Sequence, residues 1–117
     1  MFPVRWHEPF GIAIIEALAK GRPVIGSSYG SLPELIGPEK QGGLVCKNYS
    51  EFERVISDPP IHFLSEQVRD YFEKNFTSRI MANNYLPFYE QVIQGIPLHS
   101  KPPKTCFLDH PESLLEF

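Results

Sequence analysis

Residues 8–27 read EPFGIAIIEALAKGRPVIGS, and this stretch decides the fold. Its apolar first half predicts a helix from about Phe10 to Lys20, with a proline just ahead of it that suits a first helical turn. Gly-Arg-Pro at 21–23 ends that helix, and the apolar run at 24–27 predicts a buried strand. A helix that leads directly into a buried strand is typical of an α/β protein.

The flanking segments extend the same pattern. Residues 2–4 predict the end of one more buried strand, and residues 42–46 turn through two glycines into another. Ser31 is placed to cap a short helix over Leu32–Ile36. Three further helices are expected: one from a Ser50–Glu53 capping box through Ser57, one over 64–75, and one over 78–94 that Pro87 should kink or split. The aromatic residues between Tyr71 and Tyr89 are interpreted as helix packing.

The expected fold class is α/β, with a partial Rossmann-like parallel sheet of about three strands flanked by helices. A parallel sheet normally has more strands, so we expect the chain to be truncated and the sheet to be the last half of a doubly wound domain. Residues 1–95 form this expected domain. Beyond Gly95 prolines and polar residues predominate, and residues 96–117 are expected to be an extended or disordered tail.

Composition excludes several classes of protein. A chain of 117 residues with 42% hydrophobic and 21% charged residues matches one small soluble domain. The net charge of −3 leaves no basic face for nucleic acid. The longest apolar stretch, 12–19, is too short to cross a bilayer, and the N-terminus lacks a signal-peptide pattern. Cys46 and Cys106 have no partner motif and are interpreted as free thiols, so a cytoplasmic location is expected.

The loop around Gly11 is the first candidate site. It joins the expected strand at 2–4 to the helix that follows, so it lies at the carboxyl end of a strand, where open α/β sheets bind ligands. The N–H groups and the positive dipole end of a helix N-terminus form an anion site. Gly11 carries no side chain that would keep a phosphate or a sugar from the backbone.

Glu16 is the second candidate, because it interrupts a helix that is otherwise apolar. A carboxylate partly shielded from water needs donors, and a ribose diol would offer two hydroxyl groups. If the whole of 8–16 were helical, Glu8 and Glu16 would lie roughly 12 Å apart. One acid would then be near a sugar and the other near a ribose, with a diphosphate between them.

Simpler interpretations remain open. Glu16 could lie on a narrow solvent-facing stripe or pair with a basic residue. A glycosidase pair fits poorly, since hydrolases place their two carboxyl groups about 5–9.5 Å apart across one bond. His7 has no second His or Cys at ligand spacing, so no metal site is expected and His7 is interpreted mainly as a loop residue.

An ordered series of motifs resembles family 4 retaining glycosyltransferases. Glu8 and Glu16 are separated by seven residues, with Pro-Phe-Gly after the first acid and Ala-Leu-Ala-Lys-Gly-Arg-Pro-Val-Ile-Gly after the second. The similarity continues through Gly-Ser-Leu-Pro-Glu-Leu-Ile at 30–36 and Gly-Gly-Leu-Val at 42–45, and it covers roughly residues 2–95.

The resemblance implies a GT-B architecture, in which two Rossmann-like domains face a cleft and the C-terminal one binds a nucleoside-diphosphate sugar. By position, Glu8 matches the acid that contacts the donor sugar at the reaction centre. Phe10, Gly11 and Ile12 match the loop whose amides meet the sugar and diphosphate. Glu16 matches the acid that holds the ribose, and no cofactor or obligatory metal is implied. Gly30 and Ser31 match a loop that borders the pocket.

Two family features are not matched: the N-terminal acceptor domain and an upstream basic pair that neutralises the diphosphate. Without that pair, stabilisation of the departing diphosphate would be largely lost, so the chain alone is expected to be inactive. The leading hypothesis is therefore a glycosyltransferase fragment that binds the donor. The alternatives are a non-catalytic module that pairs with a separate subunit, and an unrelated α/β domain in which Glu16 is structural.

Overall fold

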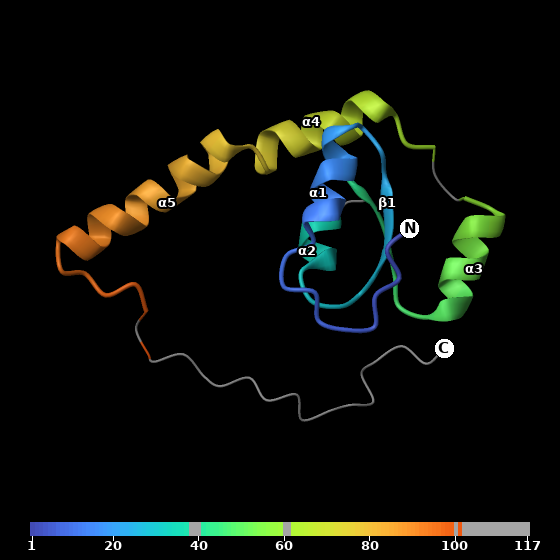
Figure 1. Cartoon of the computed structure of the whole chain (residues 1–117), viewed down its shortest axis with the longest axis horizontal. Helices are drawn as coiled ribbons and strands as arrows, with labels where there is room; N and C mark the ends of the chain where they lie inside the picture. Colours follow the sequence, from blue (N-terminus) through green and yellow to red (C-terminus); the bar gives the residue numbers. More distant parts are fainter. Residues whose placement is uncertain (38–40, 60–61, 100, 102–117) are drawn as a thin grey trace.

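The computed structural model describes residues 1–37, 41–59, 62–99 and 101, and its elements alternate between helix and strand (Figure 1). Every predicted helix is present, with bounds that differ by two residues or fewer at most ends. In chain order the elements are α1 (Ile12–Ala19), β1 (Val24–Ser27), α2 (Leu32–Ile36), β2 (Gly43–Cys46), α3 (Tyr49–Ser57), α4 (Ser65–Asn75) and α5 (Ser78–Ile93).

The sheet is parallel, as predicted, and its two strands pair from Val24 opposite Gly43 to Ser27 opposite Cys46. The third strand expected at 2–4 is only a single bridge, between Phe2 and Gly26. Here the Phe2 N–H donates to the carbonyl of Ile25 at 2.8 Å, on the edge of β1 that faces away from β2. The next backbone carbonyl that faces β1, that of Val4, accepts from the Ser27 side-chain hydroxyl at 2.7 Å instead of from a backbone N–H, and the ladder does not continue.

Helices cover both sides of this small sheet. Figure 1 shows α1 and α2 on one side and α3 on the other. Helix α1 turns Ile14 and Leu18, one turn apart, into the core. Gly26 permits the close approach of α2, since a Cβ atom at this position would lie 2.7 Å from the Ile36 side chain. The buried core residues are Val4, Ile14, Leu18, Val24, Tyr29, Leu32, Leu35, Ile36, Leu44, Cys46, Phe52, Val55 and Val68.

Helix α3 is capped two residues earlier than expected. The Oδ1 atom of Asn48 accepts a hydrogen bond from the Glu51 N–H at 3.0 Å, and the Glu51 carboxylate accepts one from the Lys47 N–H at 2.7 Å. The predicted Ser50–Glu53 capping box is therefore wrong. Asn caps helices as well as Ser does, and the extended backbone of Asn48 already supplies the geometry of an N-cap.

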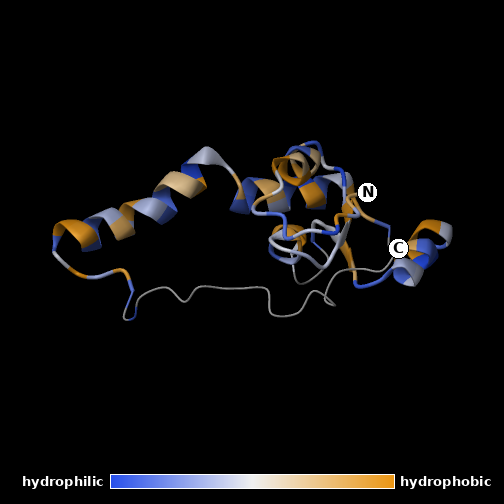
Figure 2. Cartoon of the chain, turned by 60° about the horizontal axis from the view of Figure 1, so that its bottom comes forward, coloured by the Kyte–Doolittle hydropathy of each residue, from blue (hydrophilic) through white to orange (hydrophobic). Residues whose placement is uncertain are grey.

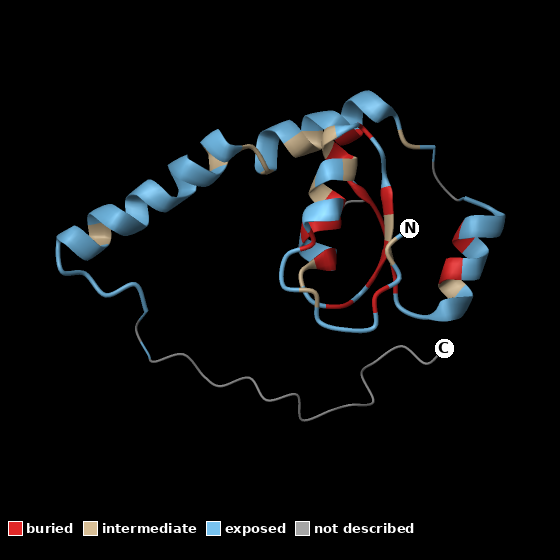
Figure 3. Ribbon diagram, viewed as in Figure 1, coloured by how far each residue is buried: buried red, intermediate tan, exposed pale blue. Residues whose placement is uncertain are grey.

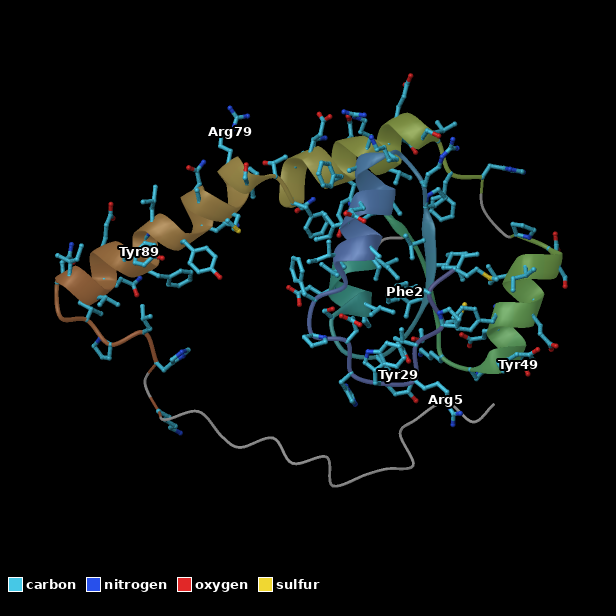
Figure 4. All side chains as sticks on the ribbon, in the orientation of Figure 1. Phe2, Arg5, Tyr29, Tyr49, Arg79 and Tyr89 are labelled. Carbon is cyan, nitrogen blue, oxygen red and sulfur yellow. The ribbon has the colours of Figure 1, made fainter. Side chains whose placement is uncertain are left out.

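Helix α5 is one continuous helix that includes Pro87, so the predicted split does not occur. None of its residues is buried, and it extends away from the core (Figure 3). Apolar residues are nevertheless spaced along it (Figure 2), and Tyr89 lies on the part farthest from the sheet (Figure 4). The interpretation of the aromatic residues between Tyr71 and Tyr89 as helix packing is confirmed for Tyr71, Phe72 and Phe76, which pack against the core, and is wrong for those of α5, which are exposed. The exposed apolar residues of α5 are Met81, Tyr85, Leu86, Phe88, Tyr89, Val92 and Ile93.

Some expectations lie largely outside the described residues. Of the tail predicted at 96–117, only residues 96–99 and 101 are described, so the division at residue 95 stays a prediction. Cys106 also lies outside them, whereas Cys46 is a buried free thiol in β2. No helix in the described ranges has the length and apolar character needed to cross a membrane.

Candidate functional site

Two loops meet where strands end, and they bring five of the predicted site residues together. The loop at 5–11 precedes α1, and the loop at 28–31 follows β1. The Ser31 N–H donates to the carbonyl of Glu8 at 2.9 Å, and the Ser31 hydroxyl donates to the carbonyl of Phe10 at 2.9 Å. Ser31 occupies the N-cap position of α2, but its side chain makes no cap hydrogen bond there. It holds the first loop instead.

Gly30 is the point of closest approach between the two loops. Its φ is +57°, and a Cβ atom at this position would collide with the backbone nitrogen and oxygen of Glu8. A residue with a side chain would therefore be strained in its own conformation and would push the Glu8 loop away. The glycine allows the backbone of Glu8 to pack directly against the end of β1.

Two further contacts hold the segment that leads into α1 against β1 and the loop that follows it. Ser27, which is fully buried at the end of β1, donates its hydroxyl to the carbonyl of Val4 at 2.7 Å. The His7 ring packs edge-on against the ring of Tyr29, with centroids 5.6 Å apart. Tyr29 is labelled in Figure 4, in the loop after β1. His7 is thus a packing residue of the loop, as the sequence suggested.

The Glu8 carboxylate is half-buried, and each of its oxygens accepts one hydrogen bond. One oxygen accepts from the indole N–H of Trp6 at 3.1 Å, and the other accepts from the Gly11 N–H at 3.1 Å. Two donors on different oxygens restrict the rotation of the carboxylate. Glu8 is therefore held in a defined orientation beside the N-terminus of α1, although its side chain is partly exposed to solvent.

Gly11 opens helix α1 in the left-handed conformation, with φ +82°. Its own N–H is used by Glu8, and its carbonyl accepts from the Ile14 N–H at 3.0 Å. The next two N–H groups, of Ile12 and Ala13, have no acceptor within an α-helix. An anion at this helix end would thus meet the amides of Ile12 and Ala13 rather than that of Gly11. The side chains of Phe10 and Ile12 are 52% and 66% exposed beside it.

Glu16 is exposed, so the expectation that it would be shielded from water is wrong. It lies one turn after Ile12, on the face of α1 opposite Ile14 and Leu18. The sequence could not reveal this because both faces of the helix are apolar. The estimated separation of the two acids assumed a helix over all of 8–16, and this condition is not met, since α1 begins at Ile12.

The remaining ionisable groups near the sheet do not suggest a nucleophile or a metal. Burial raises the pKa of the Cys46 thiol, and the nearby Glu51 raises it further against the opposing effect of Arg54, so this thiol is protonated at neutral pH. Within the described ranges, no group of three or more His, Cys, Asp or Glu residues is arranged to hold a metal ion.

The sequence has counterparts in known proteins. Residues 1–76 match the family model described as glycosyl transferases group 1. The chain belongs to this family. Membership agrees with the α/β fold observed here and with the order of motifs in the sequence.

Individual relatives are similar over much of the chain. The chain is 33% identical over 96 residues to an uncharacterized 41.2 kDa protein in the cps region of Klebsiella pneumoniae, covering 77% of the chain and 26% of that relative. It is 39% identical over 75 residues to an uncharacterized glycosyltransferase of Methanocaldococcus jannaschii, covering 58% and 19%. It is 32% identical over 94 residues to spore coat protein SA of Bacillus subtilis, covering 74% and 25%.

The chain spans about a quarter or less of the length of these curated relatives. No solved structure gives a significant match. The family is therefore established by sequence, and the fold is consistent with part of a Rossmann-like GT-B domain.

One contact at the site was missed from the sequence. Trp6 was assigned only to a loop, yet its indole donates to Glu8. The available signal was its position two residues before the acid, where a long donor side chain can reach back to a carboxylate at a loop turn. Trp6 is also the only tryptophan in the chain. Tryptophan side chains are highly buried on average, so a tryptophan in a polar loop is unusual.

Proposed function

We propose that this chain binds the donor of a family 4 retaining glycosyltransferase, a nucleoside-diphosphate sugar. The observation that carries the proposal is the packing of the Glu8 loop and the start of α1 against Gly30 and Ser31 at the carboxyl edge of the sheet. Open α/β sheets bind ligands at this edge, and membership of the glycosyltransferase family supports a nucleotide-sugar ligand.

Each residue then has a distinct part in binding. The diphosphate lies at the N-terminus of α1, where the amides of Ile12 and Ala13 and the helix dipole favour negative charge. Glu16, on the exposed face of the same helix, accepts hydrogen bonds from the two ribose hydroxyl groups. Glu8 accepts from a hydroxyl of the donor sugar, and Phe10 lies beside it.

The reaction breaks the bond between the sugar and the diphosphate oxygen, and the new bond to the acceptor oxygen forms with retention at the anomeric carbon while the acceptor hydroxyl passes its proton to the departing diphosphate. The diphosphate leaves with added negative charge, which the start of α1 partly stabilises. The acceptor domain and the basic pair of the family complete the site in this proposal. No metal takes part, and the reaction is cytoplasmic.

Calorimetric titration of the chain with uridine, guanosine and adenosine diphosphates tests the proposal. We expect one of them to bind, and Glu16→Gln to weaken it about tenfold, because charge-assisted hydrogen bonds to the ribose are lost. Glu66→Gln is the matched control, since Glu66 is also an exposed helical glutamate but lies in the first turn of α4. Equal affinities for the wild type and both variants, or no binding at all, would contradict the proposal.

A second candidate is a non-catalytic module that pairs with a separate polypeptide. The observation that favours it is helix α5, which has no buried residue and exposes apolar side chains along its length. Unpaired apolar faces of this kind are typical of protein interfaces. This candidate predicts that the chain binds no nucleotide even when a second polypeptide covers α5, whereas the donor-binding function predicts nucleotide affinity.

A further inference from the structure

The indole of Trp6 is directed at the acid of the proposed donor site. Its Nε1–H donates to Glu8 Oε2 at 3.1 Å, while the Gly11 N–H holds Oε1 at 3.1 Å. The two donors come from opposite sides of Glu8 in the chain, one two residues before it and the other three residues after it. Gly11 contributes a backbone N–H, whereas Trp6 contributes a side-chain donor to this carboxylate.

The indole that makes this hydrogen bond is not part of the core. Trp6 is 58% exposed, and it is absent from the buried core and from the apolar residues packed around it. An exposed tryptophan stabilises a fold little, because most of its apolar surface stays in water. The contact with Glu8 is thus the specific interaction that the structure gives this side chain.

A carboxylate has about four lone-pair positions, of which Trp6 and Gly11 use one on each oxygen. The positions that remain are those available to a hydroxyl group of a ligand. If the indole donor were removed, the carboxylate could rotate about its terminal bond, a torsion with broad energy wells, and the direction of the remaining lone pairs would no longer be fixed.

We propose that Trp6 is a positioning residue of the donor site, which fixes the Glu8 carboxylate so that it accepts a hydroxyl group of the donor sugar. This inference rests on the proposed function. It assigns Trp6 an effect on the sugar part of the donor and none on the nucleoside diphosphate part, because Trp6 acts only through Glu8.

The hydrogen bond itself is tested first by NMR on the labelled chain. A single tryptophan gives a single indole N–H signal. Glu8→Ala removes the acceptor and should shift this signal, whereas Glu16→Ala, in the same segment, should leave it in place. An indole signal that Glu8→Ala does not move would overturn the proposal.

The positioning effect is tested by comparing two ligands in calorimetry: the nucleoside diphosphate that binds and its sugar-bearing form. Trp6→Phe keeps an aromatic ring and loses the N–H, so we expect the sugar-bearing ligand to bind about tenfold more weakly and the diphosphate to bind unchanged. Trp6→His, which keeps a ring N–H, should restore part of the difference. Equal losses for both ligands, or no loss for either, would refute the positioning role.

The two failures are distinguishable. If the wild-type chain binds neither ligand, the proposed function fails and the role of Trp6 in donor binding fails with it, whatever the indole signal shows. If the wild type binds both ligands and Trp6→Phe does not separate them, the proposed function stands and only the positioning role is overturned.

Discussion

Replacement of Gly30 by alanine should disturb the candidate site more than any other small change in it. The added Cβ atom would collide with the backbone of Glu8, and a backbone cannot move aside by changing rotamer. The left-handed conformation at φ +57° adds about 1–2 kcal/mol for a residue with a side chain. Overpacking adds about 1–3 kcal/mol, so the expected loss in the free energy of unfolding is about 2–5 kcal/mol.

Gly11→Ala is the matched control, because Gly11 lies on the facing loop and also has a positive φ, +82°. Its added Cβ atom would meet side-chain ends, at 3.1 Å from Ile14 and 3.4 Å from Leu35, which can shift slightly. We therefore expect only the conformational part, about 1–2 kcal/mol. Urea unfolding followed by circular dichroism compares the two variants, and a Gly30→Ala chain as stable as the Gly11→Ala chain would refute the reasoning.

Three further predictions concern stability and are measured by the same unfolding experiment. Leu18→Ala should lose about 2–5 kcal/mol, because Leu18 is fully buried, whereas Ile12→Ala on the exposed face of the same helix should change stability by less than about 0.5 kcal/mol; similar losses would contradict the assigned faces. Asn48→Ala removes the cap of α3 and should cost about 1 kcal/mol, and an unchanged midpoint would argue against the cap. Burial, and secondly the charge of Glu34, raise the pKa of Tyr71, so the folded state favours the protonated phenol. The free energy of unfolding should therefore fall as the pH rises above about 10, and it should fall less in Tyr71→Phe.

The sequence predicted most elements because their signals are local. The apolar run at 24–27 and the Ser-Leu-Pro-Glu segment at 31–34 give β1 and α2 with the bounds that the structure shows. The strand at 2–4 was overestimated, since only Phe2 pairs with β1 and the Val4 carbonyl accepts from the Ser27 side chain instead. The cap of α3 was misplaced because Asn48 and Ser50 are both good N-caps, and only the backbone conformation distinguishes them.

For the candidate site, the sequence predicted which residues lie close together better than it predicted their contacts. The resemblance to glycosyltransferases brought Glu8, Phe10, Gly30 and Ser31 into one hypothesis, and the structure places them in two loops that touch. The exposure of Glu16 was missed, because a helix with apolar residues on every side gives no sign of which face is buried. The donation from Ser31 to Phe10 depends on how two loops meet, and the hydrogen bond from Trp6 to Glu8 depends on the turn within one loop.

The most direct test of donor binding is an amide NMR titration of the labelled chain with uridine, guanosine and adenosine diphosphates, repeated for Glu16→Gln. The account predicts that one diphosphate shifts the amide signals of Ile12 and Ala13 and that these shifts are lost or strongly weakened in the variant. A well-dispersed spectrum in which none of the three diphosphates moves these signals would contradict it.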